Sequence, residues 1–128
     1  MESNKPFSFF ARIKSVGFAL EGIVLYFKTQ HNALIQAVVA IIVIVLGFIL
    51  KADSTEWCFL ICAIALVIIS EMLNTAIEFL TDLASPEINP QAKKIKDVAA
   101  GAVLIAAIAA ATIGMIIFVP KLMVAISF

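Results

Sequence analysis

The fold of this chain is decided by residues 57–82, which read WCFLICAIALVIISEMLNTAIEFLTD. The run 57–70 carries no charge, and four polar residues then follow at helical spacing: Glu71, Asn74, Glu78 and Asp82. At about 100° per residue, these side chains fall within an arc of roughly 80° on one helix. A carboxylate surrounded by lipid costs about 2.5 kcal/mol or more, so this acidic stripe must face protein, water or a cation. We interpret it as a candidate functional site on a membrane helix.

The composition indicates a membrane protein. Of the 128 residues, 63% are hydrophobic, and the mean hydropathy is +1.12. Soluble domains usually contain about 45–50% apolar residues. We therefore expect a single membrane-embedded domain over residues 1–128. The formal net charge is zero, so the chain offers no overall electrostatic attraction to nucleic acid, and no nucleic-acid partner is expected.

The hydrophobic pattern predicts an all-α membrane protein. An amphipathic surface helix is expected over about residues 6–29, with Asn4 as its cap and Pro6 as its first residue. Three transmembrane helices are expected over about residues 32–50, 56–82 and 92–119. Residues 85–90 (Ser-Pro-Glu-Ile-Asn-Pro) are expected to form a loop, and Pro120 is expected to close the third span.

The basic residues predict an orientation. Of the nine Lys and Arg residues, two fall on one side of the predicted membrane, namely Lys51 and Lys121. The other seven fall on the opposite side: Lys5, Arg12, Lys14, Lys28, Lys93, Lys94 and Lys96. Basic residues accumulate on the cytoplasmic side of membrane proteins. The N-terminus and the second loop are therefore expected in the cytoplasm, and the acidic stripe opens toward the side where ATP is found.

The third predicted span favours close packing between helices. It is rich in alanine and glycine, and small residues let membrane helices approach one another closely. Three helices alone can barely enclose the acidic stripe, so we expect a homo-oligomer. The composition by itself does not give the number of subunits.

The polar residues near the cytoplasmic boundary suit phosphoryl transfer to a lipid alcohol. Lys96 and Asp97 begin the third span at about the depth of Asp82. Mg²⁺ is held by one or two carboxylates together with substrate phosphates, and a neighbouring lysine suits phosphate charge. A deeper carboxylate can accept the proton of a lipid hydroxyl, and such a transfer depends mainly on positioning and charge neutralisation. The phosphate-binding pattern G-x-x-x-x-G-K-[ST] does not occur in the sequence.

The motif Glu71-x-x-Asn74-Thr-Ala-Ile-Glu78-x-x-x-Asp82, followed by Lys96-Asp97, resembles that of a known family. It is similar to the bacterial integral-membrane diacylglycerol kinases, including their undecaprenol kinase branch, over roughly residues 8–121. The resemblance implies a lipid kinase in the bacterial cytoplasmic membrane that uses ATP and Mg²⁺. It also implies a homotrimer, with a surface helix and three spans in each subunit and with sites shared between subunits.

The resemblance implies roles for individual residues. Glu71 matches the catalytic base toward the lipid hydroxyl, and Asn74 matches the residue that positions the reacting groups, so both are expected to contact the lipid substrate. Glu78 matches a metal-binding carboxylate. The nucleotide end of the site is implied for six residues: Asp82, Lys96, Asp97, Glu87, Lys14 and Arg12.

One position departs from the family pattern. Gln30 stands where the family usually has a glutamate that holds metal together with the Glu78 equivalent. Glutamine keeps a carbonyl oxygen but lacks the charge, so weaker Mg²⁺ binding is expected unless a neighbour compensates. The alternative hypothesis is therefore a weakly active or inactive family member with a structural or regulatory role.

Two further questions stay open at this point. A proton or ion conduit also uses intramembrane carboxylates, but it predicts polar residues across the whole membrane depth, whereas here they gather near one side. The lipid acceptor is either undecaprenol or diacylglycerol. The segments SPEINPQA (85–92) and KDVAAGAVL (96–104) look more like the undecaprenol kinase branch, although both acceptors present a primary hydroxyl near the interface.

Overall fold

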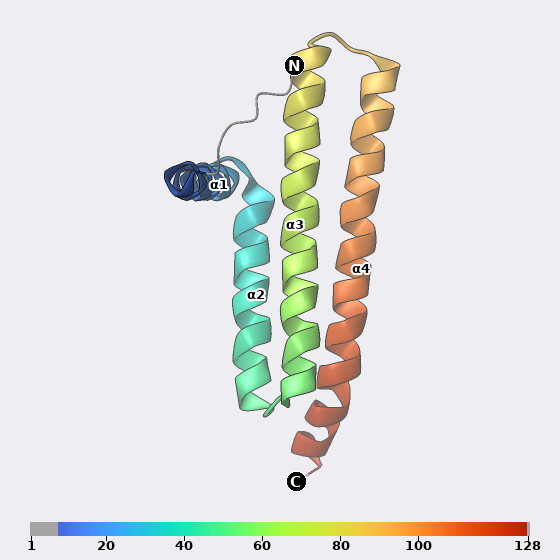
Figure 1. Cartoon of the computed structure of the whole chain (residues 1–128). Helices are drawn as coiled ribbons and strands as arrows, with labels where there is room; N and C mark the ends of the chain where they lie inside the picture. Colours follow the sequence, from blue (N-terminus) through green and yellow to red (C-terminus); the bar gives the residue numbers. More distant parts are fainter. Residues whose placement is uncertain (1–7, 128) are drawn as a thin grey trace.

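The computed structural model describes residues 8–127 as four α-helices: α1 (Phe9–Thr29), α2 (His31–Ile49), α3 (Ser54–Ala84) and α4 (Pro90–Ile126). Figure 1 shows α2, α3 and α4 side by side, each antiparallel to the next along the chain. Helix α1 lies to one side of the bundle, beside the start of α2, and runs crosswise to the three long helices. No strand occurs among the described residues. The predicted all-α architecture is confirmed.

Helices α2, α3 and α4 are each long and apolar enough to cross a membrane. The 19 residues of α2 rise about 28 Å at 1.5 Å per residue, close to the ~30 Å hydrocarbon thickness of a bilayer. Large apolar side chains such as Ile41, Phe59 and Ile105 point outward and are exposed, as a lipid-facing surface requires. The chain is therefore a membrane protein.

The turn between α2 and α3 is tightly specified by its backbone. Lys51 has a positive φ of 51°, and the Ala52 N–H donates to the Gly47 carbonyl at 2.8 Å, as in a Schellman motif. Helix α3 then begins with a capping box in which Asp53 and Glu56 satisfy each other's backbone N–H groups. These caps reverse the chain direction within a few residues.

The predicted start of the first helix and the predicted end of the third span can be compared with the structure. The predicted start at Asn4 and Pro6 lies outside the described residues; within them, α1 begins at Phe9 and Ser8 is its N-cap. The prediction that Pro120 ends the third span's helix is wrong, because α4 continues through Pro120 to Ile126. A proline removes only one backbone donor, and the surrounding turns keep theirs, so membrane helices tolerate it.

The best-packed part of the bundle lies at the end that contains the α2–α3 turn. Leu60 of α3 and Ile117 and Phe118 of α4 are buried there. Six partly buried side chains surround them: Val43, Leu46, Leu50, Ala52, Trp57 and Ile113. Lys121 of α4 also forms an ion pair with Glu56 of α3 at 2.9 Å. We call this region the core end.

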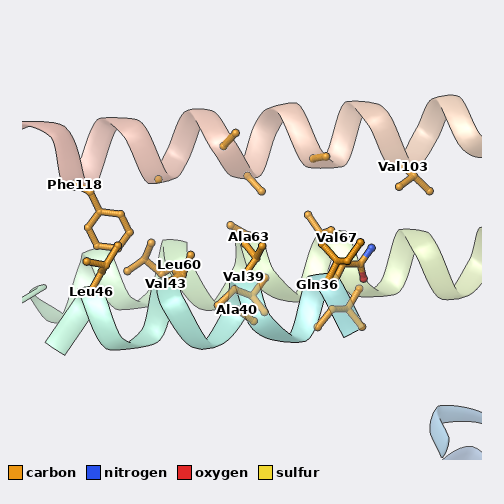
Figure 2. Close-up of a pocket in the computed structure, with 17 residues that line it drawn as sticks. Gln36, Val39, Ala40, Val43, Leu46, Leu60, Ala63, Val67, Val103 and Phe118 are labelled. Atoms are coloured by element: carbon orange, nitrogen blue, oxygen red, sulfur yellow. The ribbon is translucent and has the colours of Figure 1, made fainter. Parts of the chain in front are cut away.

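Helix α2 stands apart from α4 over much of its length, whereas α3 and α4 pack together extensively. An apolar groove of about 390 Å³ lies between the three helices. In Figure 2 it extends from Gln36 and Val103 at one end to Leu46 and Phe118 at the other. The groove thus connects the core end with the region of α2 that lies beside α1.

Candidate functional site

Glu71 is the buried centre of the acidic stripe. Only 6% of its surface is exposed, and its carboxylate oxygen Oε1 accepts a hydrogen bond of 2.9 Å from Nδ2 of Asn32. Asn32 is the second residue of α2, so this bond joins the start of α2 to the middle of α3. A buried carboxylate needs such a donor, because burial without one is costly. The carboxylate is therefore held in place by a second helix.

A second polar contact lies next to Glu71. Tyr26 of α1 is buried, and its hydroxyl donates to Oε1 of Gln36 at 2.8 Å. Burial raises the pKa of Tyr26, and the negative charge of Glu71 raises it further. The sequence analysis missed the roles of Tyr26, Asn32 and Gln36. A signal was present, since Asn32 and Gln36 are one helical turn apart near the start of an otherwise apolar span.

Asn74 and Glu78 form the middle of the stripe. Nδ2 of Asn74 donates to Oε1 of Glu78 at 3.0 Å along one turn of α3. The amide oxygen Oδ1 of Asn74 is buried and has no hydrogen-bond partner among the described residues. Rotating the amide would set its oxygen against the carboxylate, so the observed orientation is the favourable one. A buried acceptor without a donor is rare enough to suggest that a ligand completes it.

The outer end of the stripe is charged and accessible. Lys96 of α4 forms an ion pair with Asp82 of α3, and Lys93 pairs with Asp97 one turn away on α4. The carboxylates of Asp82 and Asp97 are more than half exposed. Both pairs lie toward the end of the bundle that carries the loop between α3 and α4. This end is open to solvent and can receive a charged ligand.

The other predicted site residues lie on α1, at the α1–α2 junction and in the loop after α3. Gln30 lies at the α1–α2 junction, where its backbone N–H donates to the Tyr26 carbonyl at 3.0 Å, and its side chain makes no cap bond to α2. Glu87 is exposed in the loop between α3 and α4. Arg12 and Lys14 are exposed near the start of α1. The described hydrogen bonds and ion pairs connect Glu71, Asn74, Glu78, Asp82 and Lys96 with their neighbours, but none of them joins the side chain of Gln30, Glu87 or Lys14 to the stripe.

The donors present fit a magnesium ion that is partly held by substrate. Residues 8–127 contain no group of three or more His, Cys, Asp or Glu side chains placed to hold a metal. The Glu78 carboxylate and the unpartnered Oδ1 of Asn74 are nevertheless oxygen donors on adjacent turns. Magnesium characteristically takes one or two carboxylates and completes its shell with water and phosphate oxygens. Such a set can hold the ion together with a nucleotide.

Comparisons with known proteins agree with the motif. A family model described as prokaryotic diacylglycerol kinase matches residues 17–118. The chain is 39% identical over 95 residues to an undecaprenol kinase of Bacillus subtilis, covering 74% of this chain and 77% of that protein. It is 37% identical over 110 residues to a diacylglycerol kinase of Synechocystis, covering 85% of this chain and 63% of that protein.

A third relative matches at a lower identity. The chain is 30% identical over 108 residues to the diacylglycerol kinase of Escherichia coli strain K12, covering 84% of this chain and 88% of that protein. The family predicted from the stripe motif and its Lys-Asp pair is thereby confirmed, as is the prediction of a lipid kinase. This chain belongs to the prokaryotic diacylglycerol kinase family.

Proposed function

We propose that the protein transfers the γ-phosphate of ATP to the hydroxyl of a membrane lipid alcohol in a Mg²⁺-dependent reaction. The observation that carries the proposal is the buried Glu71 carboxylate, which Asn32 holds in place. Asn74, Glu78 and Asp82 follow it along α3 toward the exposed end, where Lys96 of α4 pairs with Asp82. The order matches what the reaction needs, from a proton acceptor at the lipid to charged groups at the nucleotide.

Glu71 acts as the general base in this proposal. The lipid hydroxyl oxygen attacks the γ-phosphorus, the bond from that phosphorus to the β–γ bridging oxygen breaks, and the hydroxyl proton passes to Glu71. ADP leaves with the electron pair of the broken bond. Asn74 orients the hydroxyl and the phosphate, and Lys96 neutralises negative charge on the transferring group.

Glu78 and Asn74 are the residues proposed to hold Mg²⁺, with Gln30 as a neutral oxygen donor at the α1–α2 junction. When bound, the ion would supply positive charge that neutralises the nucleotide phosphates. Asp82, Asp97 and Glu87 are assigned to the nucleotide end. Lys14 and Arg12 are assigned there from α1.

The proposed setting is the bacterial inner membrane, with the N-terminus and the α3–α4 loop in the cytoplasm. In the topology predicted from the sequence, seven of the nine Lys and Arg residues fall toward that side, which favours this orientation. The stripe is then exposed to cytoplasmic ATP. We also propose a homotrimer, because the resemblance implies one and because α2 leaves an apolar groove beside α4 that a single chain does not fill.

The acceptor is proposed to be undecaprenol or diacylglycerol. The relatives compared above carry both names, and each lipid presents one primary hydroxyl near the interface. A side-by-side assay decides between them: the purified protein in detergent micelles receives each lipid in turn, with γ-labelled ATP and Mg²⁺. Labelled lipid phosphate is the expected product. Absence of transfer to both lipids, with the protein folded, would refute the proposal.

Gln30 supports one alternative, a family member with little activity and a structural or regulatory role. In that case the protein binds ATP and Mg²⁺ weakly, and neither lipid is phosphorylated at a useful rate. The same assay at increasing Mg²⁺ concentration separates the two hypotheses, because an active kinase with a weak metal site regains its rate at high Mg²⁺.

A further inference from the structure

The start of α2 supplies a residue that lies far along the chain from the stretch between Glu71 and Asp97. Asn32 lies 39 residues before Glu71 in the sequence, yet its Nδ2 donates to the Glu71 carboxylate at 2.9 Å. Asn32 itself is exposed, whereas its partner is buried. Its side chain therefore adds little to packing, and its principal contact is with the proposed base.

A neighbouring contact fixes the position of Asn32. The next residue, Ala33, is fully buried at 0% exposure, which presses the first turn of α2 against the rest of the protein. One turn further on, Gln36 accepts the hydrogen bond from Tyr26 of α1. Residues 32 and 36 share a helix face because they are four apart. The amide of Asn32 thus points to Glu71 from a backbone that the burial of Ala33 holds in place, whereas Gln36 makes a separate bond to α1.

The hydrogen bond has a consequence for the two carboxylate oxygens of Glu71. Oε1 accepts from Asn32, and no described hydrogen bond reaches Oε2. An amide NH₂ is a donor, so it stabilises the carboxylate as a proton acceptor and leaves the second oxygen available. We propose that Asn32 is a positioning residue that fixes the rotamer of Glu71 and directs its free oxygen toward the lipid hydroxyl. This inference rests on the proposed function, in which Glu71 accepts that proton.

The first test is Asn32→Leu, which removes the donor with little change in size. Misplacing a reacting group by about 1 Å can cost roughly 100-fold in rate. We expect kcat to fall by about 10- to 100-fold while KM for ATP stays within about twofold, since the nucleotide end lies more than two turns away on α3. Asn32→Asp, which keeps the shape but replaces the donor with a second carboxylate, should lose at least as much. An unchanged kcat in either variant would overturn the inference.

Gln36→Leu is the matched control. It also removes an interhelical hydrogen bond from α2, one turn along, but that bond does not involve Glu71. We expect lower thermal stability and a kcat within about threefold of the parent, on the same positioning argument. If Asn32→Leu and Gln36→Leu lower kcat equally, the contacts at the start of α2 maintain the fold rather than the position of Glu71, and the inference fails.

A double-mutant cycle gives the decisive readout. If Asn32 acts through Glu71, then Asn32→Leu should cause no further loss of the residual rate in a Glu71→Gln background, because coupled residues are not additive. An equal fold-loss in both backgrounds would show that Asn32 acts elsewhere.

The parent, the single variants Asn32→Leu and Glu71→Gln, and the double variant can also be compared by thermal unfolding, without an activity assay. Their melting temperatures should be non-additive, because the two side chains share a hydrogen bond. If the parent transfers no phosphate to either lipid, the proposed function fails, but this thermal cycle still decides whether Asn32 holds Glu71. Additive shifts in melting temperature would overturn the inference.

Discussion

The two ends of the bundle are held together by different means. At the core end, Leu60, Ile117 and Phe118 are buried against one another, and Trp57 packs over Gly47. At the opposite end, α2 meets α3 through the hydrogen bond between Asn32 and Glu71. Apolar packing resists displacement in all directions, whereas a single directional hydrogen bond leaves neighbouring space for a ligand. The core end therefore maintains the fold, whereas the opposite end, which we call the polar end, is arranged for chemistry.

The largest expected effect comes from removing the base at the polar end. Glu71→Gln keeps the side chain's size but cannot accept a proton, and general-base catalysis contributes about 10²- to 10⁴-fold in rate. We expect phosphate transfer to fall by that factor while ATP·Mg²⁺ binding, measured by calorimetry, stays close to that of the parent. Substantial transfer by this variant would remove Glu71 from the base role.

The next effect concerns the core end. Leu60 is 1% exposed, so Leu60→Ala should leave a cavity and lower the free energy of unfolding by about 2–4 kcal/mol. Thermal unfolding in detergent measures the loss. At a temperature where the variant is folded, its kcat should remain close to that of the parent. A large fall in kcat at that temperature would show that the two ends are not separate in function.

A smaller effect is expected at the close approach of α2 to α3. A Cβ added to Gly47 would lie 2.8 Å from the Trp57 ring, a distance that forces the indole to move. Gly47→Ala should therefore destabilise the protein by about 1–3 kcal/mol. Trp57 is the single tryptophan, so its fluorescence spectrum reports the displacement directly. An unshifted spectrum with unchanged stability would contradict the described packing.

The variant Gln30→Glu tests whether residue 30 belongs to the proposed magnesium site. If position 30 contributes an oxygen to Mg²⁺, the added charge should lower the Mg²⁺ concentration needed for half-maximal activity several-fold, since hard cations prefer charged oxygen donors. A magnesium titration of the parent and the variant measures the change. Identical titrations would place residue 30 outside the metal site.

The smallest expected effect is a pKa change at the single tyrosine of the chain, Tyr26. Its pKa is raised above the ordinary 10.0, first by burial and then by Glu71. Glu71→Gln removes the charge but not the burial, so the pKa should fall toward 10.0 without reaching it. Ultraviolet absorbance of the phenolate follows this titration. An unchanged pKa would show that Tyr26 and Glu71 do not interact.

The raised pKa also predicts how stability depends on pH. Because the folded protein holds the Tyr26 proton more tightly than the unfolded chain, this contribution is complete below about pH 10. It is lost as the pH rises through the raised folded pKa. Tyr26→Phe should therefore unfold with a weaker dependence on alkaline pH than the parent, and parallel curves would contradict the assignment.

Much of the fold and part of the site could be predicted from the sequence. The apolar runs between charged residues indicated three membrane helices, and the spacing of Glu71, Asn74, Glu78 and Asp82 indicated one polar helix face. Such predictions succeed because helical periodicity and lipid exclusion of charge act locally along the chain. The continuation of α4 past Pro120 could not be predicted with the same rules, because the cost of a proline depends on whether neighbouring turns keep their hydrogen bonds.

The sequence by itself determined that this is an all-α membrane protein with an acidic stripe at one membrane boundary, since composition and period suffice for that. Only the tertiary structure decided which side chains meet that stripe. Asn32 contacts Glu71 across 39 positions, and Tyr26 reaches Gln36 from another helix. No local rule relates residues so far apart, because their distance depends on how the junction between α1 and α2 directs the chain.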